Sequence, residues 1–347
     1  MAQRWKHRPP GSNWGEFGPD DQLGRMNYVT RDKVLQGVAE VKEGRTFCLS
    51  LPLDYPGGSV LNPRRRPPRL APTLRAGKPN FCYPLADDNP LLDDVVCDDL
   101  VLLTLQYSTQ WDSLAHVGGR FDADGDGEAE LVFYNGYRAG EDITTAPANP
   151  SAEPWARFEG SRAAALGIQG LAEHGAQGRG VMVDLHAHFG RERRPIGYDD
   201  LMRVLDHDQV VVEKGDLVCF YTGFADVLLE MNHQPDPAVV HDTCTGLDGR
   251  DDRLLAWVTD SGCAALIADN YAVEIIPPRA WKATPHALMP LHEHCLFKNG
   301  IHLGEIWYLT ELARWLRAHG RSRFLLTAPP LRLPGAVGSP AAAVATV

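Results

Sequence analysis

The chain has 347 residues, of which 44% are hydrophobic, and its 45 acidic and 34 basic side chains give a formal net charge of -11. This length and apolar content allow a full hydrophobic core, whereas the acidic balance and the lack of a basic stripe argue against nucleic-acid binding. No apolar run could cross a bilayer, and the N-terminus lacks the apolar part of a secretory signal. The seven scattered cysteines include no C-x-x-C pair, which favours a reducing, cytoplasmic setting.

The first half of the chain alternates helix-like and strand-like segments. Residues 1–11 are basic and proline-rich, so we expect a flexible N-terminal segment before a catalytic domain at 12–333. Periodicity predicts a helix at 31–41 capped by Thr30, a strand at 100–110, a helix at 161–174 ended by Gly175, and a strand at 180–189. The proline- and arginine-rich stretch 55–72, with the solvated run at 64–66, is expected to form a loop or arm.

The second half continues the alternation. It predicts a strand at 216–222, a helix at 251–263, strands at 264–268 and 300–303, a helix at 310–318 and a strand at 323–327. The small residues of 334–347 predict a flexible C-terminal tail. Interleaved strands and helices favour an α/β fold, with a central mixed β-sheet or barrel-like core and peripheral helices in a single domain.

A polar cluster surrounds Asp112. On an extended strand Gln106, Ser108 and Gln110 share one face, and Asp112 joins them if the extended geometry continues. His116 follows four residues later, about one helical turn. A carboxylate beside an imidazole can orient the ring for acid–base chemistry. The residues alone leave a second interpretation open, a hydrogen-bonded strand end with a surface histidine.

The same segment resembles the motif H-x-G-T-H-x-D-x-x-x-H of the cyclase superfamily, which includes kynurenine formamidases and isatin hydrolase. Thr109, Asp112 and His116 match its threonine, aspartate and last histidine. Further similar segments follow in the shared order, at 12–24, 134–137, 178–180, 215–223, 268–270 and 300–305. The resemblance implies a swivelling β/β/α domain that hydrolyses a non-peptide amide, imide or lactam C–N bond in a small cyclic or aromatic substrate. It also implies a homodimer or homotetramer.

The metal site implied by the resemblance is altered in this chain. Gln106 and Gln110 stand where the family has two metal-binding histidines, and Asp112 is the third ligand. A neutral amide oxygen is a weaker donor than an imidazole. We therefore expect at most one weakly held divalent ion, manganese, zinc or magnesium. Without a metal, the alternatives are a metal-independent cyclase, dehydratase or isomerase, or a ligand-binding homologue that has lost catalysis.

The resemblance also implies a histidine and a glutamate from the C-terminal part of the chain. His292 is the candidate, with His294 as the alternative, and Glu305 is the carboxylate. Together with Asp112 and His116 they would form the catalytic set. The predicted substrate-binding residues are Trp14, Phe17, Tyr107, Trp111, Tyr134 and Asn135, for which ordinary core packing is the alternative.

Two other groups of residues could bind a cation. Asp184, His186 and His188 would share one face of the predicted strand at 180–189, where two imidazoles and a carboxylate could hold a metal. The segment 122–127 resembles the first half of a calcium-binding loop but lacks the glutamate at its twelfth position. A polar strand face and an acidic surface turn are the simpler interpretations.

Overall fold

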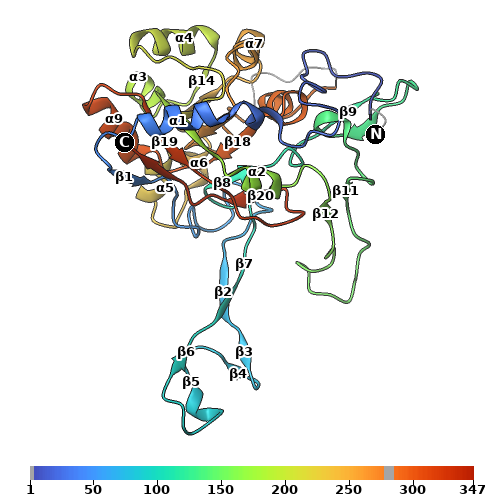
Figure 1. Cartoon of the computed structure of the whole chain (residues 1–347), viewed down its shortest axis with the longest axis vertical. Helices are drawn as coiled ribbons and strands as arrows, with labels where there is room; N and C mark the ends of the chain where they lie inside the picture. The colour runs from blue at the N-terminus through green and yellow to red at the C-terminus, as the bar shows by residue number, and fades with distance from the viewer. Residues whose placement is uncertain (1–3, 277–284) are drawn as a thin grey trace.

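The computed structural model describes residues 4–276 and 285–347, and a nine-stranded sheet lies at its centre (Figure 1). The strand order is β1-β21-β19-β13-β15-β17-β18-β8-β20. These strands are β1 (Thr46–Cys48), β8 (Gln110–Asp112), β13 (Gln177–Asp184), β15 (Leu217–Tyr221), β17 (Ala265–Ala268), β18 (His302–Glu305), β19 (Arg323–Thr327), β20 (Gly338–Pro340) and β21 (Val344–Thr346). β13, β15, β17 and β18 are parallel, and the flanking pairs are antiparallel. The predicted α/β single domain with a mixed central sheet is confirmed.

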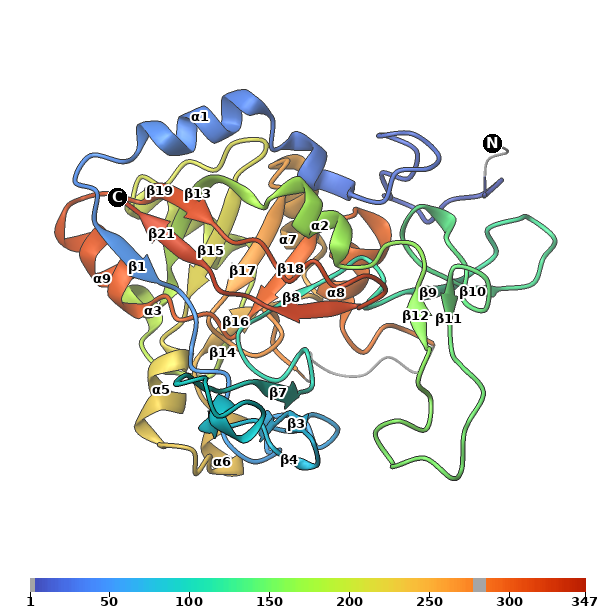
Figure 2. The same ribbon diagram turned by 60° about the horizontal axis from the view of Figure 1, so that its bottom comes forward.

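Helices cover both faces of this sheet. They are α1 (Arg31–Ala39), α2 (Gln169–His174), α3 (Leu185–Phe189), α4 (Tyr198–His207), α5 (Phe224–Glu230), α6 (Pro237–Val240), α7 (Asp252–Asp260), α8 (Pro290–His292) and α9 (Thr310–Ala318). Successive residues of β13 enter different apolar layers: Val181 and Val183 pack with α4 and α7, whereas Met182 packs with α9. α1 contacts β13 and β19 (Figure 2). Burial on both faces explains why β15 and β17 are uninterrupted apolar runs.

Several elements lie where the sequence predicts them. α1 begins after Thr30, whose hydroxyl accepts a hydrogen bond from the Lys33 amide, and α7 occupies most of the predicted helix. α9 and β19 coincide with their predicted bounds, and β15 and β17 lie within theirs. β18 begins and ends two residues later than the predicted strand at 300–303, and so includes Glu305. These are the segments in which a cap or a continuous apolar run marks the element.

Three predicted elements are wrong. The strand predicted at 100–110 is two strands of different sheets, β7 (Asp99–Leu102) and β8, joined by turns and bends. The helix predicted at 161–174 is reduced to α2, which Gly175 ends with φ 99°, after the short strand β12 (Arg162–Ala163). The strand predicted at 180–189 ends at Asp184 and continues as α3. In the first two cases turns and bends interrupt a pattern that the sequence alone makes continuous, and in the third the strand passes directly into a helix capped by Asp184.

Both predicted flexible ends are attached to the body. β20 pairs with β8, and β21 lies between β1 and β19, so the prediction of a mobile tail at 334–347 is wrong. Ala343, Ala345 and Val347 are buried, because small side chains allow close packing. At the other end Trp5 is buried and the Lys6 amide donates to the Ala123 carbonyl at 2.7 Å. Residues 1–3 of the predicted N-terminal segment lie outside the described residues.

A long ribbon, residues 69–102, projects from the body (Figure 1). It consists of β2 (Arg69–Pro72) paired with β7, β3 (Leu74–Arg75) with β4 (Lys78–Pro79), and β5 (Tyr83–Pro84) with β6 (Val95–Val96). Its exposed large apolar side chains are Leu70, Leu74, Phe81, Leu91, Leu92, Val95, Leu100, Val101 and Leu102. The stretch 55–72, predicted to form a loop or arm, is a loop as far as residue 68, where Tyr55 and Leu61 are buried in the body, and enters the ribbon at β2.

The remaining short strands form three small sheets: β9 (Gly119–Phe121) with β10 (Glu130–Val132), β11 (Ile143–Thr144) with β12, and β14 (Arg194–Ile196) with β16 (Thr245–Leu247). Among the helices of the described ranges, none has both the length and the apolar character needed to span a bilayer.

Candidate active site

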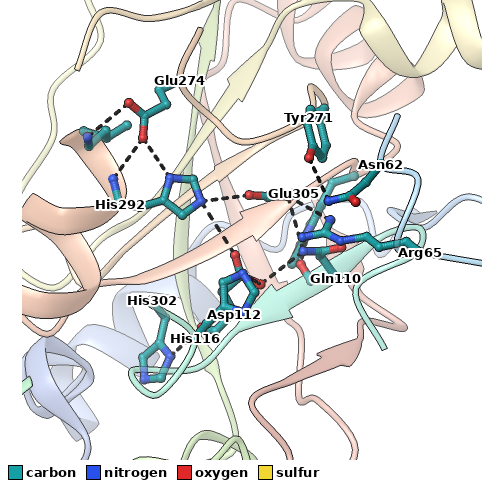
Figure 3. A network of polar contacts seen from close by, with 12 residues as sticks. Asn62, Arg65, Gln110, Asp112, His116, Tyr271, Glu274, His292, His302 and Glu305 are labelled. Carbon is teal, nitrogen blue, oxygen red and sulfur yellow. Dashed lines mark hydrogen bonds and ion pairs between the residues drawn. The ribbon is translucent and has the colours of Figure 1, made fainter. Parts of the chain in front are cut away.

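The pairing of β8 with β18 brings the first three site residues together. Gln110 and Asp112 lie two residues apart on β8, and Gln110 is opposite Glu305 in the antiparallel ladder. Side chains at such positions share a face. The Gln110 amide nitrogen donates to Asp112 Oδ1 at 3.1 Å and to Glu305 Oε2 at 3.2 Å (Figure 3). All three are buried.

His292 closes this group from the C-terminus of α8. Its Nε2 lies 3.1 Å from Glu305 Oε1 and 3.9 Å from Asp112 Oδ2, and its Nδ1 lies 2.8 Å from Glu274 Oε1 (Figure 3). The same Glu274 carboxylate accepts the backbone amides of Leu291 and His292. Burial alone would lower the pKa of His292, but the two carboxylates outweigh it and raise the pKa to about 10. The imidazole is therefore held as a cation between carboxylates.

His294, the alternative candidate, lies elsewhere. Its Nε2 is 2.9 Å from the Thr259 hydroxyl, and burial lowers its pKa to about 4. Between the two histidines, the structure brings only His292 to Asp112.

His116 lies on the other side of Asp112. The His116 amide donates to the Ser113 carbonyl at 3.0 Å, so a tight turn, not a helix, returns its side chain towards the strand. Its Nε2 is 3.9 Å from Asp112 Oδ1, and the side chain is 21% exposed. Because Asp112 is fully buried, His116 is the more accessible member of the pair, at the boundary between site and solvent.

Arg65, which the sequence predicts to lie in a solvated run, adds a cation to the site. Its Nη1 lies 3.9 Å from Glu305 Oε2, its guanidinium carbon is 5.7 Å from the Tyr271 ring centroid, and the side chain is only 16% exposed (Figure 3). Beside it the Asn62 amide donates to the Tyr271 hydroxyl at 3.3 Å. A small pocket is lined here by Asn62, Arg65, Tyr107, Tyr271 and Ile306 among others. No periodic pattern marks Arg65 in the sequence; its neighbours at 64 and 66 are exposed.

Three buried polar atoms of this site have no hydrogen-bond partner among the described residues: Asp112 Oδ2, Gln110 Oε1 and Arg65 Nη1. Buried polar atoms are nearly always hydrogen-bonded. Three unpaired ones in a single site therefore indicate that these groups bind water or a ligand. Burial also raises the pKa of Asp112, against the opposing effect of His116. Glu305 shows the reverse: burial would raise its pKa, but the hydrogen bond and charge of His292 lower it. The two carboxyl groups thus have different proton affinities.

The donor atoms can also hold a metal ion. One atom each of Asp112, His292 and Glu305 lie within 4.8 Å of one another, and two carboxylates with one imidazole suit a divalent cation. The metal would have to displace the Nε2 proton of His292, because a protonated imidazole has no lone pair to donate. The unpaired Asp112 oxygen agrees with this fit. Gln106, a predicted ligand, comes from a turn and its amide nitrogen fills the space over Gly338, where a Cβ would lie 2.5 Å away. The candidate ligands therefore keep Asp112 and the unpaired Gln110 Oε1 of the predicted set and add His292 and Glu305.

Comparison with known proteins identifies the family. The family model described as "Putative cyclase" matches residues 50–275. The chain belongs to the cyclase family. A solved structure described as a novel cyclase is 29% identical, with a TM-score of 0.71 over 97% of each chain. No curated protein matches the chain.

Isatin hydrolases share the fold of this cyclase-family chain. Isatin hydrolase A from Ralstonia solanacearum has a TM-score of 0.53 at 12% identity, covering 90% of this chain and 95% of its own. The isatin hydrolase A from Labrenzia aggregata has a TM-score of 0.53 at 11% identity, covering 90% of this chain and 97% of its own.

Most predicted substrate-binding residues of this cyclase-family chain lie in its core. Trp111 lies between Gln110 and Asp112 on β8, so its ring faces the opposite side, and its indole donates to the Ala328 carbonyl. Trp14 and Tyr134 are buried in an apolar cluster, Phe17 packs on Tyr28, and Asn135 binds backbone groups of residues 15–21. Only Tyr107 lines the pocket beside Arg65. Core packing, the alternative interpretation, describes Trp14, Trp111 and Tyr134, whereas Phe17 is partly exposed and Asn135 holds the N-terminal segment by hydrogen bonds.

The structure also describes the two other predicted cation sites, the strand face at 184–188 and the acidic turn at 122–127. Asp184 accepts the Ala187 amide and pairs with Arg317, while His186 Nδ1 lies 3.1 Å from the Gly190 carbonyl oxygen. His188 turns instead to Asp208, 2.9 Å away, which also pairs with His207; these three lie within metal-binding distance of one another. The predicted set Asp184, His186 and His188 is therefore not assembled. In the acidic turn at 122–127, carboxylate oxygens of Asp122, Asp124 and Asp126 do lie within 4.8 Å of one another, although these carboxylates mostly accept amides of the turn itself.

Proposed function

We propose that this cyclase-family chain is a hydrolase of a non-peptide C–N bond, in an amide, imide or lactam of a small cyclic or aromatic molecule. The observation that carries the proposal is the buried Asp112–His292–Glu305 group, in which Asp112 Oδ2 is unpaired and Glu305 Oε2 lies 3.9 Å from the unpaired Arg65 Nη1. Amide hydrolysis needs a base for water, an acid for the leaving nitrogen and positive charge for the tetrahedral oxyanion. Each of these can be supplied by a residue of the group.

Asp112 is the proposed base. Its buried carboxyl has a raised pKa and one unpaired oxygen, so it can accept a proton from an attacking water more readily than an ordinary aspartate. His116, 3.9 Å from the other oxygen and partly exposed, is the proposed acid that delivers a proton to the leaving nitrogen. Glu305 is fixed by His292 and Gln110 and orients the water.

Arg65 is proposed to offset the negative charge of the oxyanion. Its Nη1 is buried and unpaired, and at 3.9 Å from Glu305 it is too far away for a tight ion pair that would neutralise it. A guanidinium in a water-poor site stabilises a developing anion far better than in bulk water. A divalent ion held by Asp112, His292 and Glu305 would polarise the carbonyl and lower the pKa of a bound water.

The test uses the purified chain with isatin and N-formylated aromatic amines, each with EDTA or with added manganese, zinc or magnesium. We expect hydrolysis of at least one substrate, measured as ring-opened acid or free amine, and its loss in Asp112→Asn. The matched control is Asp124→Asn, which changes an aspartate of the acidic turn at 122–127. If no substrate is hydrolysed faster than in buffer under any of these conditions, the proposal is wrong.

A metal-independent cyclase, dehydratase or isomerase is the second candidate. It is favoured by one observation: Arg65 and the His292 cation already supply positive charge next to Asp112. Proton transfer between Asp112 and His116 would then be sufficient for the chemistry. Activity that is unchanged by EDTA, with a product of the same mass as the substrate or lighter by one water, would favour this candidate over hydrolysis.

We further propose that the chain acts in the cytoplasm as a homodimer or homotetramer. The ribbon supports the assembly, because a two-stranded ribbon with many exposed apolar side chains is marginal without a partner. A second copy of the chain is the proposed partner. Light scattering that gives a monomer at micromolar concentration would contradict this.

A further inference from the structure

The tip of the ribbon contains two cysteines from opposite strands. Tyr83 pairs with Val96 and Pro84 with Val95, so Cys82 and Cys97 are the next pair in the same antiparallel register. Their sulfur atoms lie 4.0 Å apart, and the Cys82 amide donates to Cys97 Sγ at 3.0 Å. Opposite residues of an antiparallel pair have Cα atoms about 4.5–5.5 Å apart, which lies within the range that a disulfide spans.

These two thiols differ from the other five in the chain. Cys219, Cys244, Cys263 and Cys295 are buried, and Cys48 is exposed on β1 beside Ser50. Cys82 and Cys97 are both exposed and adjacent. Among the seven cysteines, they are therefore the pair that an oxidant in solution can reach and that can join after a rotation of side chains.

The tip also lacks other stabilising contacts. β5 and β6 have two residues each, and the exposed apolar side chains Leu91 and Val95 find no core there. Hydrogen bonds such as that from the Leu85 amide to the Asp94 carbonyl are open to water, which competes for both groups. A covalent link at the base of the 83–96 loop would restrict its unfolded states, the way disulfides stabilise segments without a core.

We propose that Cys82 and Cys97 form a reversible disulfide that fixes the tip of the ribbon. The bond forms by thiol–disulfide exchange with a small disulfide, oxidised glutathione. One thiolate attacks it and releases one reduced glutathione; the second thiolate attacks the mixed disulfide and releases another. The two cysteines lose two electrons and two protons, and the oxidant gains them.

The experiment incubates the full chain with oxidised glutathione and counts free thiols in denaturant. We expect the count to fall from seven to five, with a peptide that joins residues 82 and 97 in a non-reduced digest. Dithiothreitol should restore all seven. Oxidation should also slow proteolysis within the 83–96 loop several-fold, because the linked tip opens less often.

Three variants make the result specific. In Cys82→Ser and Cys97→Ser the remaining cysteine of the pair should stop at the mixed disulfide with glutathione, and no link within the chain should form. Cys48→Ser should still form the link between residues 82 and 97. Circular dichroism and hydrolase assays should be unchanged in all three, since these residues lie outside the candidate site. Seven free thiols after oxidation, a disulfide that maps to other cysteines, or a link between two chains through Cys82 or Cys97 would each overturn the proposal.

Discussion

The sheet body and the projecting ribbon are stabilised in different ways. In the body, apolar side chains of β13 and β15 are buried on both faces, and polar site residues are held by neighbours from several elements. In the ribbon, strands of two to four residues expose their apolar side chains. A buried polar group in the body is costly unless it is paired, so its unpaired atoms indicate function. In the ribbon it is the exposed apolar side chains that indicate function, because such patches mark surfaces that bind a partner.

The largest effect is expected at the centre of the body. Asp112→Asn and His116→Ala should each lower kcat/KM roughly 100-fold or more, since each removes a proton-transfer group. The double variant should be little worse than either single one, as expected for residues that act as a unit. Steady-state kinetics with circular dichroism would check this. Near-native turnover by folded His116→Ala would refute the assignment of the acid.

Arg65 tests whether a residue near the base of the ribbon contributes to the body's chemistry. Arg65→Gln should lower kcat roughly 10- to 100-fold with a smaller change in KM, because the guanidinium is assigned to the transition state. Arg64→Gln is the matched control, as Arg64 is exposed and should leave both constants unchanged. Equal effects of the two substitutions would mean that the arginine run at 64–66 affects catalysis only through its overall charge.

Removal of the outer part of the ribbon, residues 74–97, would sharpen the comparison directly. The Thr73 amide donates to the Asp98 carbonyl at 3.0 Å, so residues 74–97 can be replaced by two glycines. We expect the melting temperature of the shortened protein to differ from that of the full chain by only a few degrees. Light scattering should show a smaller assembly. Cooperative loss of the whole fold would show instead that the ribbon and body form one unit.

The smallest effect concerns pH. The folded-state pKa of His292 is about 10, above the usual value of about 6.5, so folding favours its protonated form. Its contribution to the free energy of unfolding is complete below pH about 6.5 and is lost as the pH rises to about 10. In metal-free protein we therefore expect denaturant titrations to give decreasing stability over this range, with a shallower slope for His292→Gln. His294→Gln should keep the native slope, because its pKa is about 4 and it stays neutral there.

Much of the candidate site could be predicted from sequence. Asp112 and His116 are close in the chain and carry a recognisable motif, and Glu305 follows an apolar strand. Arg65 and Glu274 could not be found in this way. Both come from irregular segments, and their places depend on the pairing of β8 with β18 and on the packing of α8. Such positions are set by tertiary contacts, which local periodicity does not record.

The fold shows the same division. Long apolar or amphipathic segments such as β15 and α9 were predictable, because burial imposes a period on the sequence. The small residues of β20 and β21 have no such period, yet they complete the sheet. Glycine and alanine permit close strand packing as well as disorder, and only the register with β8 and β19 decides between them.

The position of β8 between β18 and β20 has a consequence for biosynthesis. Asp112 leaves the ribosome early, yet His302, whose ring bonds to its carbonyl, follows 190 residues later, and β20 later still. Until then β8 has no neighbouring strand on either side, and the carboxylate has no assembled site. Chains whose synthesis stops before residue 338 would carry most catalytic side chains but expose β8 as an unpaired edge, prone to association with other nascent chains. Activity should therefore appear during translation as a late, single step.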